Sequence, residues 1–237
     1  MPRRRHGSRH PRPARQNHGR TEQAVSEQKA ARWESYDGGD AVVTLDDPAS
    51  RANTVNDAYR EAMLEVVNEL GRNKDAIVGV VLTSAKQTVF AGGNLEQLSA
   101  DGPDDAGKIV ELVTEAKAQL RKLETFGRPV ASALVGTALG GGLAIALATH
   151  HRVGVDATGV VYGLPEVSLG LLPGGGGVTR VTRMLGIANG FMTVLAQGQR
   201  HKPAKALELG LIDEPVATRE EAFDPPRGLV LAHPQPP

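Results

Sequence analysis

The sequence contains no cysteine. That absence excludes disulfides, thiolate metal ligands and a cysteine nucleophile, and it fits the reducing cytoplasm, which is the location we expect. No stretch reaches the ~18 uninterrupted apolar residues of a membrane span, so we expect no membrane-spanning helix. Aromatic residues make up only 3% of the chain, so a core must rest on Val, Leu, Ile and Ala.

Two ligand-binding fingerprints are also missing. The runs "GGDAVV", "GGNLEQ" and "GGGGVT" lack the spaced glycines of a dinucleotide-binding turn, and no Gly-Lys-Ser/Thr phosphate loop is present. We therefore expect neither a nucleotide cofactor nor a bound metal.

Charge is balanced overall but unevenly spread. The first 20 residues hold seven arginines and no acid, a composition typical of disorder, so residues 1–30 are predicted to be a disordered basic tail. The tail has no apolar segment of a secretory signal. One interpretation of the tail is that it binds nucleic acid or an anionic membrane, but no aromatic residues are interleaved with its arginines. The other interpretation is a mis-assigned start or an appended leader. We expect no nucleic-acid partner.

Strand-like and helix-like patterns alternate along the remaining chain. Strands are predicted at 41–48, 76–85, 128–136 and 151–155, and amphipathic helices at 57–71 and 104–126, the first capped by Asn56 or Asp57. Alternation of this kind indicates an α/β fold with crossover connections. We predict one domain over 31–222, followed by an irregular Pro-rich tail over 223–237 that its prolines prevent from being a helix.

Two segments share one design, in which a strand runs into a glycine turn and then a helix start. One carries Gly92 and Gly93, and the other carries Gly140, Gly141 and Gly142. Free N–H groups at a helix start point outward, and without Cβ atoms a ligand oxygen can approach them. Two such groups aimed at one point make an oxyanion hole, in which each donor contributes roughly 3 kcal/mol. The alternative is that the glycines only permit tight turns or close packing.

A third segment, "YGLPEVSLGLLPGGGG", places Glu166 among apolar residues. A carboxyl group surrounded by Leu164, Val167, Leu169 and Leu171 resists ionisation, so its pKa is expected to rise, as suits a general acid or base. The alternative is that Glu166 faces solvent at a strand end.

At these three segments the chain resembles the crotonase (enoyl-CoA hydratase/isomerase) superfamily. The pattern of Phe, small residue, Gly, small residue and Asp matches Phe90 through Asn94. The pattern Asn-Gly-x-Ala-x-Gly-Gly-Gly-x-Glu-Leu-Ala matches "VGTALGGGLAIA". The pattern Pro-Glu-x-x-Leu-Gly-x-x-Pro-Gly-x-Gly-Gly-x-x-Arg matches Pro165 through Arg180. Within the family the chain is most similar to the hydratase part of actinobacterial multifunctional fatty-acid oxidation alpha proteins.

The resemblance implies a crotonase-type ββα spiral core with surrounding helices, the C-terminal helical region being truncated. It also implies that the amides of Gly93 and Gly141 hold the carbonyl of an acyl-CoA thioester, and that Glu166 is a catalytic acid or base. Coenzyme A would be part of the substrate, and the resemblance implies no other cofactor. The implied assembly is a homotrimer or hexamer. The implied substrate-binding positions are Ala52, Asn53, Ala91, Gly92, Asn94, Gly140 and Ala144.

The sequence departs from the family pattern at two of these positions. The family's second catalytic glutamate would fall at Ala144, and its turn aspartate is Asn94 here. None of the nearby polar residues is expected to compensate: Glu96 is interpreted as a helix-surface charge, and His150 and His151 are interpreted as helix-end or strand-edge residues. Arg180 and Arg183 suit either phosphate contact or a solvated helix face. Loss of one of two carboxyl groups is expected to weaken hydration by the ~10²–10⁴-fold range of general acid–base catalysis.

Three functions therefore stay open from the sequence. The first is an enoyl-CoA hydratase of fatty-acid β-oxidation with weakened activity. The second is an enoyl-CoA isomerase that needs only one carboxylate. The third is a non-catalytic acyl-CoA-binding homologue.

Overall fold

The computed structural model describes residues 29–36, 38–90, 92–93 and 102–232 of the chain. In these residues a six-stranded sheet has the order β1-β2-β3-β4-β6-β9, in which β1 is antiparallel to β2 and the other neighbours are parallel. Its strands are β1 (Ala31–Ser35), β2 (Asp40–Leu45), β3 (Gly79–Ser84), β4 (Val130–Leu134), β6 (His151–Val155) and β9 (Glu214–Val216). The expected α/β class with crossover connections is confirmed.

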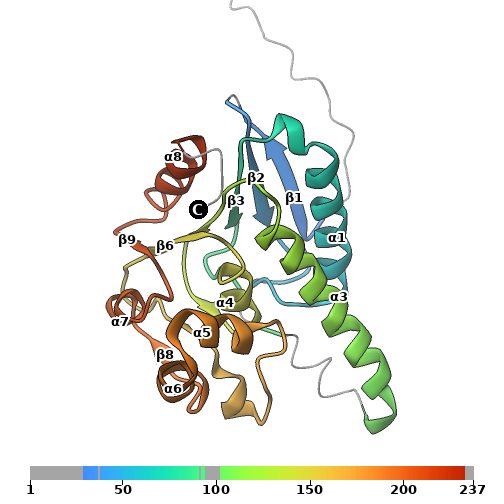
Figure 1. The fold of residues 1–237 in the computed structure, drawn as a ribbon, viewed down its shortest axis with the longest axis vertical. Helices are drawn as coiled ribbons and strands as arrows, with labels where there is room; N and C mark the ends of the chain where they lie inside the picture. Colours follow the sequence, from blue (N-terminus) through green and yellow to red (C-terminus); the bar gives the residue numbers. More distant parts are fainter. Residues whose placement is uncertain (1–28, 37, 91, 94–101, 233–237) are drawn as a thin grey trace, which may run out of the picture.

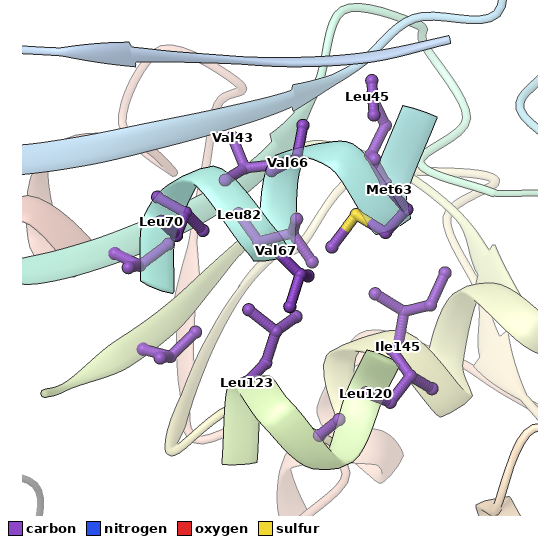
Figure 2. Close-up of a cluster of buried hydrophobic side chains, with 14 of the residues drawn as sticks. Val43, Leu45, Met63, Val66, Val67, Leu70, Leu82, Leu120, Leu123 and Ile145 are labelled. Atoms are coloured by element: carbon purple, nitrogen blue, oxygen red, sulfur yellow. The ribbon is translucent and has the colours of Figure 1, made fainter. Parts of the chain in front are cut away.

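Two long helices cover one face of this sheet (Figure 1). They are α1 (Asp57–Arg72) and α3 (Ala106–Glu124). Helix α1 begins as the sequence predicts, because the Asn56 side chain accepts a hydrogen bond from Tyr59 N at 2.8 Å. Its apolar residues recur every three or four positions, so they fall on one buried face. Figure 2 shows Met63, Val66, Val67 and Leu70 of α1 gathered with side chains from β2, β3, α3 and α4.

A further helix, α8 (Asp224–Ala232), lies against the opposite face of the sheet (Figure 1). Phe223 and Leu229 pack there on a cluster formed by Val42, Val81, Ala131 and Ala133. The prediction of an irregular segment over 223–237 is therefore wrong for 224–232. Pro225 and Pro226 stand in the first turn of the helix, where a backbone N–H has no intrahelical acceptor to lose. Residues 233–237, like residues 1–28, lie outside the described part of the chain.

Helix α8 is also held by a partly buried ion pair at the start of β2. Arg227 donates from Nε to Asp40 Oδ2 at 2.6 Å, and its guanidinium lies 4.9 Å from the ring centre of Tyr36. Asp40 is fully buried. Because a buried carboxylate is costly without a partner, this pair ties the last helix to the first strands.

A second, smaller sheet and several short helices make up most of the remaining described chain. Among the described residues a three-stranded sheet joins β5 (Ala138–Leu139), β7 (Tyr162–Gly163) and β8 (Arg200–His201). The helices here are α4 (Gly141–Ala146), α5 (Gly177–Leu185), α6 (Ile187–Gly190) and α7 (Pro203–Glu208). Shorter helical turns span Lys74–Ala76, Pro103–Asp105, Pro165–Leu169 and Phe191–Leu195.

Candidate active site

Four short segments of the chain run parallel and side by side. Val55 forms a parallel bridge with Gly93, Phe90 forms one with Ala138, and β5 pairs in parallel with β7. Ligands of parallel α/β arrangements bind beyond the carboxyl ends of their strands. The two glycine turns and Glu166 all follow directly from these segments, so the arrangement places them at a common edge.

Backbone conformation and close packing both require glycine in the second turn. Gly140 has φ +53°, in the region that disfavours side chains. A Cβ on Gly141 would stand 2.7 Å from Val55 Cγ2, and a Cβ on Gly142 would overlap Phe90 Cβ. The close-packing interpretation of the triplet therefore holds for Gly141 and Gly142.

The amides of Gly93 and Gly141 remain available within the described residues. Gly140 N donates to Gly163 O at 2.9 Å, and Val55 N donates to Gly92 O at 3.0 Å. Neither Gly93 N nor Gly141 N donates to an acceptor in the described part of the chain. Gly141 is the first residue of α4, and the first amides of a helix have no intrahelical acceptor.

The carboxyl group of Glu166 lies against the Gly140 turn. Its Oε1 is 3.1 Å from the position that a Cβ on Gly140 would take. Its Oε2 is buried and has no hydrogen-bond partner among the described residues. Burial raises the pKa of Glu166, an effect opposed only in part by a hydrogen bond to its own backbone amide.

The expected direction of that pKa shift is confirmed, but its expected cause is only partly right. Of the four apolar neighbours in sequence, Leu164 is buried, whereas Val167, Leu169 and Leu171 are exposed. The carboxyl group is shielded where it meets the Gly140 turn, a contact across 26 residues that the local sequence pattern does not contain.

Ala144 lies on the buried side of α4, with 1% of its surface exposed. A Cβ on Gly175 would stand 3.1 Å from Ala144 Cβ, so the glycine run before α5 closes over this position. Arg180 holds that run in place, because it donates from Nη1 to Gly175 O at 3.0 Å and from Nε to Glu124 Oε1 at 2.6 Å.

Arg180 is thus neither a solvated residue nor an open phosphate contact, contrary to both sequence interpretations. Its side chain is mostly buried and spans from α5 to the end of α3. Arg183 is exposed, as the helix-face interpretation predicts.

The loop before α1 carries two of the expected substrate-binding positions, Ala52 and Asn53. Asn53 is 2% exposed, and its side chain forms hydrogen bonds inside the protein. A contact between the backbone of this loop and coenzyme A stays a prediction. Ala52 N lies 3.4 Å from Ser50 Oγ. Val55 contacts both glycine turns, and sequence reasoning missed it because a single valine carries no chemical signal.

The other candidates add little to the site. His150 accepts a hydrogen bond from Val130 N at its Nδ1, which agrees with its helix-end interpretation. Ala91, Asn94 and Glu96 lie outside the described residues. Searched within the described ranges, the chain holds no group of three or more His, Asp or Glu placed to bind a metal. No helix in those ranges is long and apolar enough to cross a membrane.

Comparison with known proteins agrees with this architecture. The enoyl-CoA hydratase/isomerase family profile matches residues 36–224. The fatty acid oxidation complex subunit alpha of Idiomarina loihiensis is 37% identical over 81% of this chain. That of Shewanella loihica is 38% identical over 76% of the chain. The chain spans only 27% and 25% of the length of these two relatives.

Solved structures show the same fold. An enoyl-CoA hydratase from Polaromonas sp. JS666 superposes with a TM-score of 0.74 at 26% identity, covering 85% of this chain and 77% of that one. The enoyl-CoA hydratase of Mycobacterium smegmatis reaches 0.77 at 19% identity, covering 87% and 77%. The expected crotonase fold and the similarity to fatty-acid oxidation alpha subunits are confirmed. The chain belongs to the enoyl-CoA hydratase/isomerase family.

Proposed function

We propose that this chain is an enoyl-CoA hydratase-type enzyme of fatty-acid oxidation. It binds the thioester carbonyl of a 2-enoyl-CoA with the amides of Gly93 and Gly141, and it uses Glu166 as general acid or base. Hydration is weakened because Ala144 replaces a second carboxyl group. The alpha subunits that the chain resembles are named for fatty acid oxidation, which supports the substrate class.

The observation that carries the proposal is the state of the Glu166 carboxyl group. It is shielded beside the Gly140 turn, its Oε2 has no described partner, and its pKa is raised. A carboxyl group held in this way exchanges a proton more readily near neutral pH than an exposed glutamate. The Gly140 turn beside it leads directly into Gly141, whose amide, like that of Gly93, has no acceptor among the described residues.

The reaction needs both features together. Water adds its oxygen to the β-carbon of the enoyl thioester, and the α-carbon gains a proton. In between, negative charge develops on the thioester oxygen, where two amide donors stabilise it. Glu166 removes the proton from the attacking water or delivers one to the α-carbon. With the methyl group of Ala144 nearby, no second carboxyl group at that position orients the water.

A crotonyl-CoA hydration assay, monitored as the loss of the enoyl absorbance, tests the proposal on three proteins in parallel. The wild type is expected to show slow turnover, and Glu166→Gln is expected to lose about 10²–10⁴-fold of it. Ala144→Glu is expected to raise the rate by a comparable factor. A wild-type rate no higher than that of Glu166→Gln would rule out catalysis. Crotonyl-CoA binding without turnover, measured by calorimetry, would then assign the chain to non-catalytic acyl-CoA binding.

Ala144 also favours a second candidate, an enoyl-CoA isomerase. Moving a double bond from C3–C4 to C2–C3 removes a proton from C2 and returns one to C4, so one carboxylate beside an oxyanion hole suffices. Glu166 would carry that proton. Supplying a 3-enoyl-CoA and measuring the rise of conjugated-enoyl absorbance distinguishes the two functions, since absence of conjugated product excludes the isomerase.

We further propose that copies of this chain associate, as the resemblance implies for a trimer or hexamer. Large apolar side chains are exposed in α6 and in the nearby segments that precede α5 and follow α6 in the sequence, and exposed apolar surface of this kind is typical of protein interfaces. They include Leu169, Leu172, Ile187, Phe191 and Met192. Sedimentation velocity measures the assembly, and a monomer at micromolar concentration would contradict this part of the proposal.

A further inference from the structure

Asn53 joins three separate parts of the fold through one buried carboxamide. Its Nδ2 contacts Leu45 O at 3.2 Å, Ser84 Oγ at 2.9 Å and Val89 O at 3.0 Å, while its Oδ1 accepts from Asp47 N at 2.9 Å. Leu45 ends β2, Ser84 ends β3, and Val89 leads into the first glycine turn. The carboxamide therefore anchors that turn to the ends of two central strands.

The backbone that follows Asn53 continues the same contact. Val55 N donates to Gly92 O at 3.0 Å, and Val55 bridges Gly93. On the other side of this segment, Val89 N donates to Thr137 O at 2.9 Å. Thr137 directly precedes the residues that lead into the second glycine turn. The segment that carries Gly93 is thus held between residues 53–55 and 137–139.

The loop that presents Asn53 is itself braced by side chains. Asp47 Oδ1 accepts from Ala49 N at 2.9 Å, and Asp47 Oδ2 accepts from Asn56 Nδ2 at 2.8 Å. Asn56 in turn caps α1. Because each end of the loop is fixed, the Asn53 carboxamide has little freedom to follow a shift of Val89.

We propose that Asn53 is a positioning residue whose carboxamide sets the direction of the Gly93 amide relative to that of Gly141. This role rests on the proposed function, in which both amides hold a thioester carbonyl. The Asn53 side chain acts through hydrogen bonds to the protein alone and does not touch the substrate. The chemical requirement is for a donor, since all three groups that face Nδ2 are oxygen atoms.

Asn53→Asp tests this requirement with almost no change of shape. An ionised carboxyl group donates to none of the three oxygens and a protonated one donates to a single oxygen, so the hold on Val89 loosens. Gln119→Glu is the matched control, because Gln119 is also 2% exposed and donates from Nε2 to Arg60 O at 3.2 Å between α3 and α1. Both variants make the same amide-to-acid change in a buried site, but only the first lies beside a glycine turn.

The readout is the absorption spectrum of a bound cinnamoyl-CoA probe bearing an electron-donating ring substituent. Donors to its thioester oxygen shift the absorbance to longer wavelength without any turnover. Wild type and Gln119→Glu are expected to show the same shift. In Asn53→Asp, with one of two donors misplaced, the shift is expected to fall to about half. Where hydration is measurable, kcat is expected to fall by up to about 100-fold with little change in KM.

The outcomes separate the two proposals. A wild-type probe that binds without any shift overturns the oxyanion hole and, with it, the role of Asn53. A shift that Asn53→Asp retains in full overturns the role of Asn53 alone. If Asn53→Asp does not fold, Asn53→Ala decides, because it removes every hydrogen bond of the carboxamide, including the one to Val89 O, without burying a charge. An undiminished shift in Asn53→Ala then refutes the positioning role.

Discussion

Gly142→Ala is the sharpest perturbation of the candidate site, because it adds one methyl group where the two glycine turns meet. A Cβ at this position would overlap Phe90 Cβ and stand 3.0 Å from Phe90 O and 3.2 Å from Phe90 Cα. Carbon atoms in contact need about 3.5–4.0 Å. Because two of the three obstacles are backbone atoms, no rotamer change relieves the overlap, and α4 must move by about 1 Å away from the segment that carries Gly93.

That movement changes stability and activity by different amounts. Overpacking costs about 1–3 kcal/mol, and the gain from replacing a helical glycine with alanine offsets about 0.5–1 kcal/mol of it. The net cost of up to about 2.5 kcal/mol is therefore expected to lower the melting temperature by up to about 10 °C. A shift of about 1 Å between the two amide donors is expected to reduce kcat by up to about 100-fold.

The measurement is thermal unfolding together with crotonyl-CoA hydration, carried out on Gly142→Ala and on Gly71→Ala. Gly71 lies in α1, and a Cβ there meets nothing within 4 Å. Gly71→Ala is expected to melt higher than wild type and to keep its rate. A Gly142→Ala protein with unchanged melting temperature and rate would refute the close-packing argument.

Two further predictions concern charge. Burial raises the pKa of Glu166 above its ordinary value of 4.5, so the stability that its protonated form contributes is complete below pH 4.5 and is lost as pH rises through the raised pKa. Melting curves recorded from pH 4 to 8 are expected to show that the wild type loses stability relative to Glu166→Gln as pH rises through that pKa. Parallel pH profiles of the two proteins would contradict a raised pKa. Arg227→Met leaves fully buried Asp40 without its ion-pair partner and is expected to cost about 3 kcal/mol in urea unfolding, with Asp40→Asn in the same chain recovering part of the loss. A cost below about 1 kcal/mol, as for a surface pair, would contradict it.

Local patterns predicted the elements whose signals are contained within one segment. The strand expected at 151–155 is β6, and Asn56 caps α1 as expected. The β-branched run around Val80 is a fully buried strand, because helices cover both faces of the sheet. Strands β5, β7 and β8 escaped prediction, since two residues each are too few to show a period.

The candidate site was predictable only as a set of segments. The sequence indicated the two glycine turns and Glu166, because unusual residues stand at strand ends there. It did not indicate that Asn53 points inward or that Arg180 reaches Glu124, since these contacts join residues 36 and 56 positions apart. Helix α8 was missed for another reason: prolines break a helix interior but are tolerated in its first turn.

The parallel alignment of four distant segments has a thermodynamic consequence. A molecule bound where they end would touch chain stretches that start near residue 53 and finish near residue 166, so none of them can detach while it stays bound. An acyl-CoA present at 100 times its dissociation constant would therefore raise the unfolding free energy by about 2.7 kcal/mol. The increase in melting temperature caused by each of a series of acyl-CoA thioesters would thus rank their affinities, even if the protein converts none of them.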